Sequence, residues 1–444
     1  MTIEKQRNSA FWQRARSAFL NLTAGGDWVL SHSATTRRNL TWFWMDGMFA
    51  SASDNIVVTY LVIYFLALGA TQSQIGIMSS ISSLGAALML IPGAMLAERY
   101  GKRRNIVLSA SGWNRLALLL LAMAPFIIHS PLIILVVIGL SITRDAAANL
   151  NFPAWIAMTG DFVPIEGRGR FFSSRNFIMG ISGIIVTLLA GFLISSMKSP
   201  HGYQVSLVAA CLLGGLSLFS FSHIVDRPKA LPYQQTQQKL ALGALLREIT
   251  THRDFLIFAI TTAIWNFSLN IAGPFFTVFL VKNLHANANM VALTTIASSI
   301  AAILIQRRAG DLNDLWGARK LTMICGLLIP VVPLMWIFAT AAWNVIVINL
   351  FSGVLWAGYN LGAFNYLLIV TPEKLRARYS AIYQIVVTVS LALGAALGSF
   401  IVANPNGFHA VFFWSAIGRW VSALLFVWLV RRSLTGKRSS ETSN

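Results

Sequence analysis

The chain has 444 residues, of which 56% are hydrophobic and 11% are charged, and its formal net charge is +19 at pH 7. A water-soluble core cannot account for so much apolar sequence, so this composition excludes an ordinary soluble protein and indicates that the bilayer is the solvent. A soluble protein this basic would suggest a nucleic-acid partner, but these charges flank apolar segments, where they face anionic lipid head groups, and no nucleic-acid binding is expected.

Twelve apolar stretches are each long enough to cross a bilayer, which takes about 20 residues. They predict an all-α polytopic membrane protein. The expected spans lie near 41–68, 74–97, 105–128, 131–158, 171–195, 203–225, 255–281, 289–309, 321–341, 345–371, 379–402 and 409–430.

Basic residues fall almost entirely on one side of these spans. Because loop lysines and arginines stay in the cytoplasm, both termini are expected there, in a bacterial inner membrane. The arm over 1–40 carries apolar residues at helical spacing between arginines, which suits an interfacial helix, although a partly ordered arm explains it as well.

Two loops repeat one pattern and divide the chain into halves. A shift of 216 residues superimposes Leu96 on Leu312 and Gly101 on Gly317. A shift of 208 superimposes Pro164-x-x-x-Arg168 on Pro372-x-x-x-Arg376. The predicted organisation is the arm (1–40), a six-helix half (41–225), a cytoplasmic linker (226–254), a second six-helix half (255–431) and a tail (432–444).

With these loops the sequence resembles the major facilitator superfamily of secondary transporters, over about 40 to 432. The family signature after spans 2 and 8 has the form G-x-L-x-D-x-x-G-R-K/R. The second copy departs from it at Ala318, and the first at Ala94, Glu98 and Lys102. The resemblance implies two pseudo-symmetric six-helix halves, and it says little about the substrate.

The signature loops suit a cytoplasmic gate built from weak ion pairs, each contributing about 1 kcal/mol. The resemblance implies that Glu98 and Asp314 face helix N-termini, that Lys102 or Arg103 pairs with Asp161, and that Arg319 lies near Glu373. The alternative is that these bases only fix the topology. The predicted gate residues are Glu98, Gly101, Lys102, Arg103, Asp161, Asp314, Gly317, Arg319 and Glu373.

A charged side chain inside a predicted span costs about 2.5–3.5 kcal/mol and therefore needs a reason. Asp46 and Asp54 lie on span 1, and Arg144 and Asp145 on span 4. The arrangement is similar to that of multidrug/proton antiporters of the superfamily. That similarity implies Asp54 as the main proton-binding acid, Asp46 as an auxiliary acid and Arg144 as their partner.

Alternative explanations apply to each of these charges. Asp54 and Arg144 can form a static pair that joins spans 1 and 4, and Asp145 can pair with Arg115 on span 3. Arg419 on span 12 is expected to snorkel or to contact lipid. Span 5 lacks the Gly-Pro signature typical of the antiporters, which leaves the direction of export open.

In this fold, as the family implies, spans 1, 4, 7 and 10 line the substrate cavity. Asn270 matches Asp54 under the 216 shift, and Pro274 is expected to break span 7. Polar residues also join helices together, so each assignment has a structural alternative. The predicted cavity residues are Asn149, Asn151, Trp155, Asn266, Asn270, Trp356, Tyr359, Asn360 and Asn365.

We therefore expect a secondary transporter that works by alternating access, with proton-coupled export of small amphipathic molecules or drugs. The alternatives are uptake of a sugar, an organic acid or a peptide, and a non-transporting assembly factor or sensor. The chain has no phosphate-binding GxxxxGK[ST] loop and no nucleophile–base pair inside the spans, so we expect no enzyme activity. No cofactor or metal is expected, the partners are substrate, protons and lipids, and the protein is expected to be a monomer.

Overall fold

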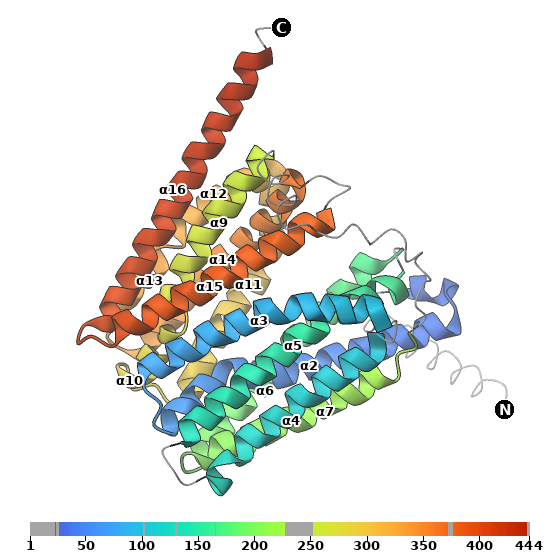
Figure 1. Cartoon of the computed structure of the whole chain (residues 1–444), viewed down its shortest axis with the longest axis vertical. Helices are drawn as coiled ribbons and strands as arrows, with labels where there is room; N and C mark the ends of the chain where they lie inside the picture. The colour runs from blue at the N-terminus through green and yellow to red at the C-terminus, as the bar shows by residue number, and fades with distance from the viewer. Residues whose placement is uncertain are drawn as a thin grey trace, which may run out of the picture. The chain divides into compact units, whose positions relative to one another are not determined.

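The structure is a computed structural model, and it describes residues 23, 26–100, 103–128, 132–164, 166–226, 252–371 and 376–441. These ranges are almost entirely helical (Figure 1), and within them twelve helices are long and apolar enough to cross a membrane. The all-α polytopic fold is confirmed. Most of the basic arm and of the central linker lies outside the described residues.

Within each half of the chain the helices follow one another with short connections. A short 3-10 helix, η1 (Asp27–Ser31), comes first. The α-helices are α2 (Ala34–Ala67), α3 (Gln72–Tyr100), α4 (Arg103–Ile127), α5 (Ile133–Phe162), α6 (Arg168–Ser196), α7 (His201–Ser222), α9 (Arg253–Ala272), α10 (Phe275–Lys282), α11 (Ala288–Trp316), α12 (Ala318–Leu328), α13 (Val331–Ile337), α14 (Ala342–Val370), α15 (Arg376–Val402) and α16 (Gly407–Glu441).

Two of the twelve spans are broken at proline. Span 7 consists of α9 and α10 with Pro274 between them, as expected from the sequence, and span 9 consists of α12 and α13 with Pro330 between them. Proline has no N–H to continue the helical hydrogen bonds, and its ring clashes with the preceding turn. The breaks leave backbone carbonyl groups that side chains can reach.

The chain forms two compact units. The N-terminal unit comprises residues 1–64 and 88–231. Within it α4 packs against α5 and α7, and α6 packs against α7. Its core near the start of α2 contains the fully buried aromatic rings of Phe43 and Phe171.

The C-terminal unit comprises residues 65–87 and 232–444. Within it α9 packs against α15 and α16, and α14 packs against α11 and α12. The first part of α3 belongs to this unit, because Gly76 lies so close to α15 that a Cβ atom there would be 2.6 Å from the Ser399 side chain. Phe255, Phe258 and Tyr379 form its aromatic core.

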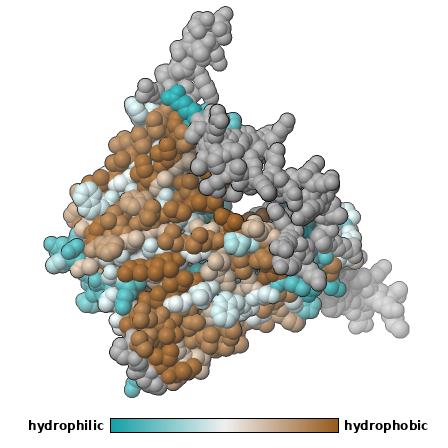
Figure 2. Space-filling view, in the orientation of Figure 1, coloured by the Kyte–Doolittle hydropathy of each residue, from teal (hydrophilic) through white to brown (hydrophobic). Residues whose placement is uncertain are grey.

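The outward faces of the helices are apolar. Large side chains such as Leu304, Phe192 and Phe400 are 76%, 69% and 71% exposed. Figure 2 shows apolar side chains over most of the face in view. In a water-soluble protein such a continuous apolar surface would be unusual, so these faces fit contact with lipid.

Candidate functional site

Asp54 is the most exposed of the acids inside the spans. It lies on α2 with 54% of its side chain exposed, and its Oδ1 accepts a hydrogen bond from Arg115 Nη1 on α4 at 3.3 Å. The same nitrogen donates to Ser53 Oγ at 3.0 Å. Gly214 on α7 leaves room for the guanidinium, since a Cβ atom there would lie 2.7 Å from Arg115 Cζ. Arg115 is therefore the partner of Asp54, where the family similarity implied Arg144.

Arg144 pairs instead with its neighbour in sequence. Its Nη1 lies 2.9 Å from Asp145 Oδ1, with side chains 12% and 32% exposed. The Arg144 carbonyl also accepts a hydrogen bond from Asn114 Nδ2 on α4 at 3.1 Å. The two predicted partners are therefore exchanged, because α4 packs against α7 and carries Arg115 toward α2.

Asp46 is buried in a junction of three helices. Its Oδ2 lies 3.5 Å from Arg175 Nη2 on α6, and both side chains are less than a tenth exposed. Ser217 Oγ on α7 donates to Asp46 Oδ1 at 2.7 Å. Arg175 also donates from Nε to the Phe43 carbonyl at 3.1 Å and stacks its guanidinium 4.2 Å from the centre of the Phe43 ring.

Sequence reasoning did not single out Arg175 as a partner of an acid inside the spans. The signal was available, because Arg175 lies seven residues beyond the start of α6, about 10 Å into the helix. A base at that depth is too far from the loop for a topological role alone. The auxiliary acid Asp46 consequently has Arg175, and not Arg144, as its partner.

The predicted cavity residues on α5 make contacts inside the N-terminal unit. Asn149 donates to the Asp145 carbonyl of its own helix at 2.9 Å, and Asn151 donates to Ser111 Oγ on α4 at 3.0 Å. Trp155 packs with its ring centroid 5.6 Å from that of Phe43. The Asn151 side chain therefore joins α4 to α5. This is the helix-joining role given above as the alternative to a contact with substrate.

Four of the predicted cavity residues meet in one pocket of the C-terminal unit. This pocket has a volume of about 200 Å³. Its lining comprises the predicted residues Asn266, Trp356, Tyr359 and Asn360, together with Trp265, Ala363, Phe364, Leu367, Tyr383, Gln384 and Val387. The lining carries aromatic faces, amides and hydroxyls and no charged side chain.

Trp265 organises the aromatic wall of this pocket, and sequence reasoning missed it. It stacks on Tyr359 with ring centroids 4.6 Å apart and meets Trp356 edge-on at 6.4 Å. Such stacks hold rings in fixed orientations. The wall is therefore a rigid π surface offered by α9 and α14.

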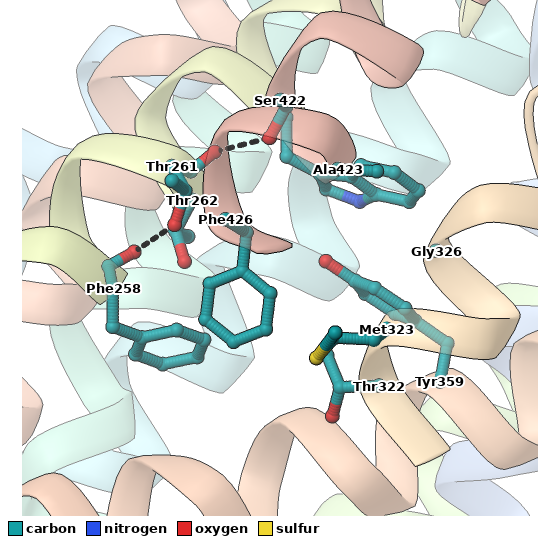
Figure 3. A pocket seen from close by; sticks show the side chains of 11 residues that line it. Phe258, Thr261, Thr262, Thr322, Met323, Gly326, Tyr359, Ser422, Ala423 and Phe426 are labelled. Atoms are coloured by element: carbon teal, nitrogen blue, oxygen red, sulfur yellow. Dashed lines mark hydrogen bonds between the residues drawn. The ribbon is translucent and has the colours of Figure 1, made fainter. Parts of the chain in front are cut away.

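Behind this wall lies a second, smaller cavity of about 20 Å³, shown in Figure 3. Tyr359 borders both cavities. Hydroxyl groups around it donate to helix carbonyls: Thr261 to Ile257 at 2.9 Å and Ser422 to Thr261 at 2.7 Å. The cavity has room for about one water molecule.

Asn270 and Asn365 lie outside the larger pocket. Asn270 donates to the Leu391 carbonyl on α15 at 2.7 Å. In the N-terminal unit it is Asn55 that lies in the matching place, against Gly183 on α6. Asn270 therefore corresponds to Asn55, and its match with Asp54 was wrong by one residue.

Arg419 is buried and does not snorkel. It is 2% exposed, and its Nη2 donates to Ser415 Oγ at 2.8 Å and to the Leu269 carbonyl at 3.4 Å. Leu269 lies in the last turn of α9, just before the break at Pro274. Carbonyl groups at a helix C-terminus favour a cation, so the broken helix explains why this arginine is stable in the interior.

At the predicted cytoplasmic gate, Arg103 holds two acids. Its Nη2 lies 2.7 Å from Asp161 Oδ2, the expected contact, and 3.1 Å from Asp226 Oδ1, which the sequence did not suggest. Gly317 joins α11 to α12 with φ 79° and ψ 151°, a conformation that favours glycine. Asp314 is exposed and Arg319 half-buried.

Three of the predicted gate residues, Gly101, Lys102 and Glu373, lie outside the described residues, as does the side chain of Glu98. The gate therefore stays a prediction in which one contact, between Arg103 and Asp161, is present.

The chain is similar in sequence to known proteins and in fold to solved structures. The multidrug resistance protein MdtG of Salmonella choleraesuis (strain SC-B67) is 26% identical over 387 residues, which cover 85% of this chain and 91% of that protein. MdtG of Salmonella typhi has the same identity and coverage. The solved nucleoside transporter NupG has a TM-score of 0.66 at 14% identity and covers 90% of this chain and 99% of its own.

The solved D-xylose-proton symporter is similar in fold as well, with a TM-score of 0.66 at 14% identity, covering 87% of this chain and 96% of its own. The family model described as the Major Facilitator Superfamily matches residues 44–269 and 258–443, which together include almost every described helix. The chain belongs to the Major Facilitator Superfamily and is a multi-pass membrane transporter.

Proposed function

We propose that this transporter exports small amphipathic organic molecules, including drugs, in exchange for protons across a bacterial inner membrane, with both termini in the cytoplasm. The observation that carries the proposal is the half-exposed Asp54 carboxylate inside a span, held by Arg115 at 3.3 Å. A carboxylate at this depth is costly unless it is used or paired.

Asp54 has the properties of a proton carrier. Its side chain is 54% exposed, so the carboxylate is accessible to a proton, and its Oδ1 accepts a hydrogen bond from Arg115 at 3.3 Å. When a proton neutralises the carboxylate, Arg115 keeps Ser53 as its acceptor and the attraction between α2 and α4 weakens. Protonation therefore changes how two helices of the N-terminal unit are held, as alternating access requires.

The C-terminal pocket supports an amphipathic substrate. Aromatic faces from Trp265, Trp356 and Tyr359 offer apolar contact, and the amides of Asn266 and Asn360 offer hydrogen bonds. Pockets that combine apolar walls with few polar groups bind small organic molecules. The likeness to proteins named for multidrug resistance supports export.

Uptake is the second candidate. The fold is similar to those of a nucleoside transporter and a D-xylose-proton symporter, and the two asparagines and Gln384 of the pocket suit a hydroxyl-rich ligand. The pocket is compatible with amphipathic molecules and with hydroxyl-rich ligands. It therefore does not indicate whether the substrate is exported or taken up, and the direction of transport has to be measured.

The test is transport by purified protein in liposomes of known orientation. A panel of fluorescent amphipathic dyes, nucleosides and sugars is offered in both directions while internal pH is recorded. We expect dye transport that moves protons, and loss of the proton movement in Asp54→Asn. Asp27→Asn, which removes an exposed acid outside the spans, is the matched control. Unchanged coupling in Asp54→Asn removes the proposal, and flux of nucleosides or sugars alone favours uptake.

A further inference from the structure

A serine contact between two helices occurs in both units, and it aligns one unit with the other. Ser53 on α2 donates to the Ala210 carbonyl on α7, and Ser415 on α16 donates to the Ser268 carbonyl on α9, both at 2.7 Å. Ser53 and Ser268 are 215 residues apart, and Ala210 and Ser415 are 205 residues apart. These two offsets relate α2 to α9 and α7 to α16.

One arginine lies at this contact in each unit. In the N-terminal unit it is Arg115, which donates to the serine hydroxyl at 3.0 Å and to Asp54 Oδ1 at 3.3 Å. In the C-terminal unit it is Arg419, which donates to the serine hydroxyl at 2.8 Å and to the Leu269 carbonyl at 3.4 Å. Leu269 is the residue that matches Asp54 by the offset of 215. The arginine is therefore repeated, while a leucine replaces the acid.

The charges inside the spans consequently balance in only one of the two units. In the N-terminal unit three acids each lie within 3.5 Å of an arginine: Asp54 with Arg115, Asp46 with Arg175, and Asp145 with Arg144. Between residues 255 and 430 the acids of the sequence lie near the cytoplasmic ends of spans 8 and 10; they are Asp311, Asp314 and Glu373. Arg419 lies near the middle of span 12 (Gly407–Leu429), where these spans have no acid at its depth.

Neutral groups hold Arg419 in the described part of the chain. Its side chain is 2% exposed, and its Nη2 contacts a hydroxyl and a carbonyl group. Its Nε is buried and has no hydrogen-bond partner among the described residues. The carbonyl end of a helix supplies about half an elementary negative charge. Arg419 therefore leaves a positive potential in its surroundings.

The charge of Arg419 acts on the aromatic pocket of the C-terminal unit. Tyr359 borders this pocket and the smaller cavity, and it interacts electrostatically with Arg419. Ser422 and Ala423, one turn beyond Arg419 on α16, line the smaller cavity. In Figure 3 the Tyr359 hydroxyl points toward the side of this cavity that α9 and α16 form. The described linings of both cavities contain no charged side chain, so Arg419 sets the sign of the potential there.

Two features of the pocket favour ligands of opposite charge. Its aromatic wall attracts cations through the ring faces. The positive charge of Arg419 repels cations and attracts anions, and it does so more strongly in a low-dielectric interior than in water. The amide groups of Asn360 and Gln384 can also donate hydrogen bonds to a carboxylate. A full charge and two amide donors thus favour an anion over a cation.

We propose that this pocket selects amphipathic molecules with a negative charge, such as aromatic carboxylates, and that Arg419 determines the selectivity through its charge. The inference rests on the proposed function, in which the pocket binds substrate, and it narrows the substrate class. The ring of the ligand packs against the aromatic wall, and its carboxylate lies beside Tyr359. The ligand then supplies the negative charge that Asp54 supplies to Arg115 in the N-terminal unit.

Three ligands with the same rings and different charges test the inference. Naphthoate is an anion, naphthamide is neutral, and naphthylmethylammonium is a cation at neutral pH. Their binding to purified protein in detergent is measured by titration calorimetry in about 1 M sodium chloride, which screens exposed charges beyond about 3 Å and acts less on a buried one. We expect the wild-type protein to bind naphthoate at least about tenfold more tightly than naphthylmethylammonium.

Three variants assign the preference to Arg419. Arg419→Lys keeps the positive charge and should keep the order of affinities. Arg419→Gln removes the charge, so naphthoate should bind about tenfold more weakly while the affinity for naphthamide stays the same. Leu269→Asp keeps the arginine and gives it an acid where Asp54 lies in the other unit, so it should weaken naphthoate binding as well and serves if Arg419→Gln does not fold. Arg307→Gln, which removes an exposed arginine of α11, is the matched control.

The inference is overturned if the wild-type protein binds the cation as tightly as the anion, if it binds none of the three ligands, or if the preference is unchanged in Arg419→Gln and Leu269→Asp. Binding is recorded without transport, which separates this result from the proposed function. A protein that prefers naphthoate but moves no protons during transport contradicts the proposed coupling and leaves the selectivity standing. A protein that exports cationic dyes with protons and binds naphthylmethylammonium more tightly contradicts the selectivity alone.

Discussion

Arg115 Nη1 on α4 lies 3.3 Å from Asp54 Oδ1 on α2, and it reaches this place over Gly214 of a third helix, α7. The ion pair between Arg115 and Asp54 therefore depends on Gly214, which forms no side-chain hydrogen bond with either of them. A side chain at position 214 would occupy the path of the guanidinium.

The variant Gly214→Ala is therefore expected to push Arg115 away from Asp54. Added volume in a packed interior costs about 1–3 kcal/mol, so thermal unfolding in detergent should show a lower melting temperature. Proton coupling in liposomes should weaken as well. Gly215→Ala is the matched control, because a Cβ atom there meets nothing within 4 Å. Equal behaviour of the two variants would show that Gly214 does not position Arg115.

Arg103 is shared by two acids, Asp161 and Asp226, with side chains 29% and 10% exposed. Removing one acid leaves the other in place, so Asp161→Asn should cost about 1 kcal/mol or less. Arg103→Gln leaves both acids without their common partner and should cost more, about 1.5–3 kcal/mol. Thermal unfolding of the Asp161→Asn and Arg103→Gln variants in detergent measures the difference between their losses of stability. If Asp161→Asn were as harmful as Arg103→Gln, Asp226 would not be a second partner.

The stack of Trp265 on Tyr359, with centroids 4.6 Å apart, is expected to form part of the substrate site. Tyr359→Ala removes one face and about 0.5–1.5 kcal/mol of ring interaction, so the KM for a transported dye should rise about tenfold at most. Tyr359→Phe keeps the ring and should change KM little. Trp343→Ala, at a residue 61% exposed near the start of α14, is the control. A KM unchanged in Tyr359→Ala would place the substrate elsewhere.

Gly317 adopts φ 79° between α11 and α12, a backbone conformation that side chains with a Cβ atom rarely adopt. Gly317→Ala should cost about 1–3 kcal/mol through backbone strain. Gly310→Ala, seven residues earlier inside α11, should be neutral or stabilising because a Cβ atom there meets nothing within 4 Å. Thermal unfolding of the two variants compares the glycines of one signature loop. A stable Gly317→Ala would mean that the connection can adopt another conformation.

Periodicity and composition predicted most of what is local. The runs of apolar residues predicted the twelve spans, and the proline inside span 7 predicted the break at Pro274. The acids of span 1 were singled out because a charged side chain inside an apolar run is energetically costly. The pocket of the C-terminal unit was anticipated in part, because Asn266, Trp356, Tyr359 and Asn360 lie on spans that the family resemblance assigned to the cavity.

Pairing between helices was not predicted. Asp54 was assigned to Arg144 and is held by Arg115, Asp46 is held by Arg175, and Arg419 is buried against the end of α9. Successive residues of a helix point about 100° apart. A sequence shows which residues share a face of one helix, but it does not show how that helix is rotated against its neighbours.

The sequence by itself determined that the chain crosses a membrane twelve times, that its halves repeat, and that its family is one of transporters, because apolar length and loop motifs are properties of contiguous residues. Only the tertiary structure decided which arginine meets which acid. That choice depends on helix rotation and on gaps left by glycines such as Gly47 and Gly214, far away in sequence from the charges they admit.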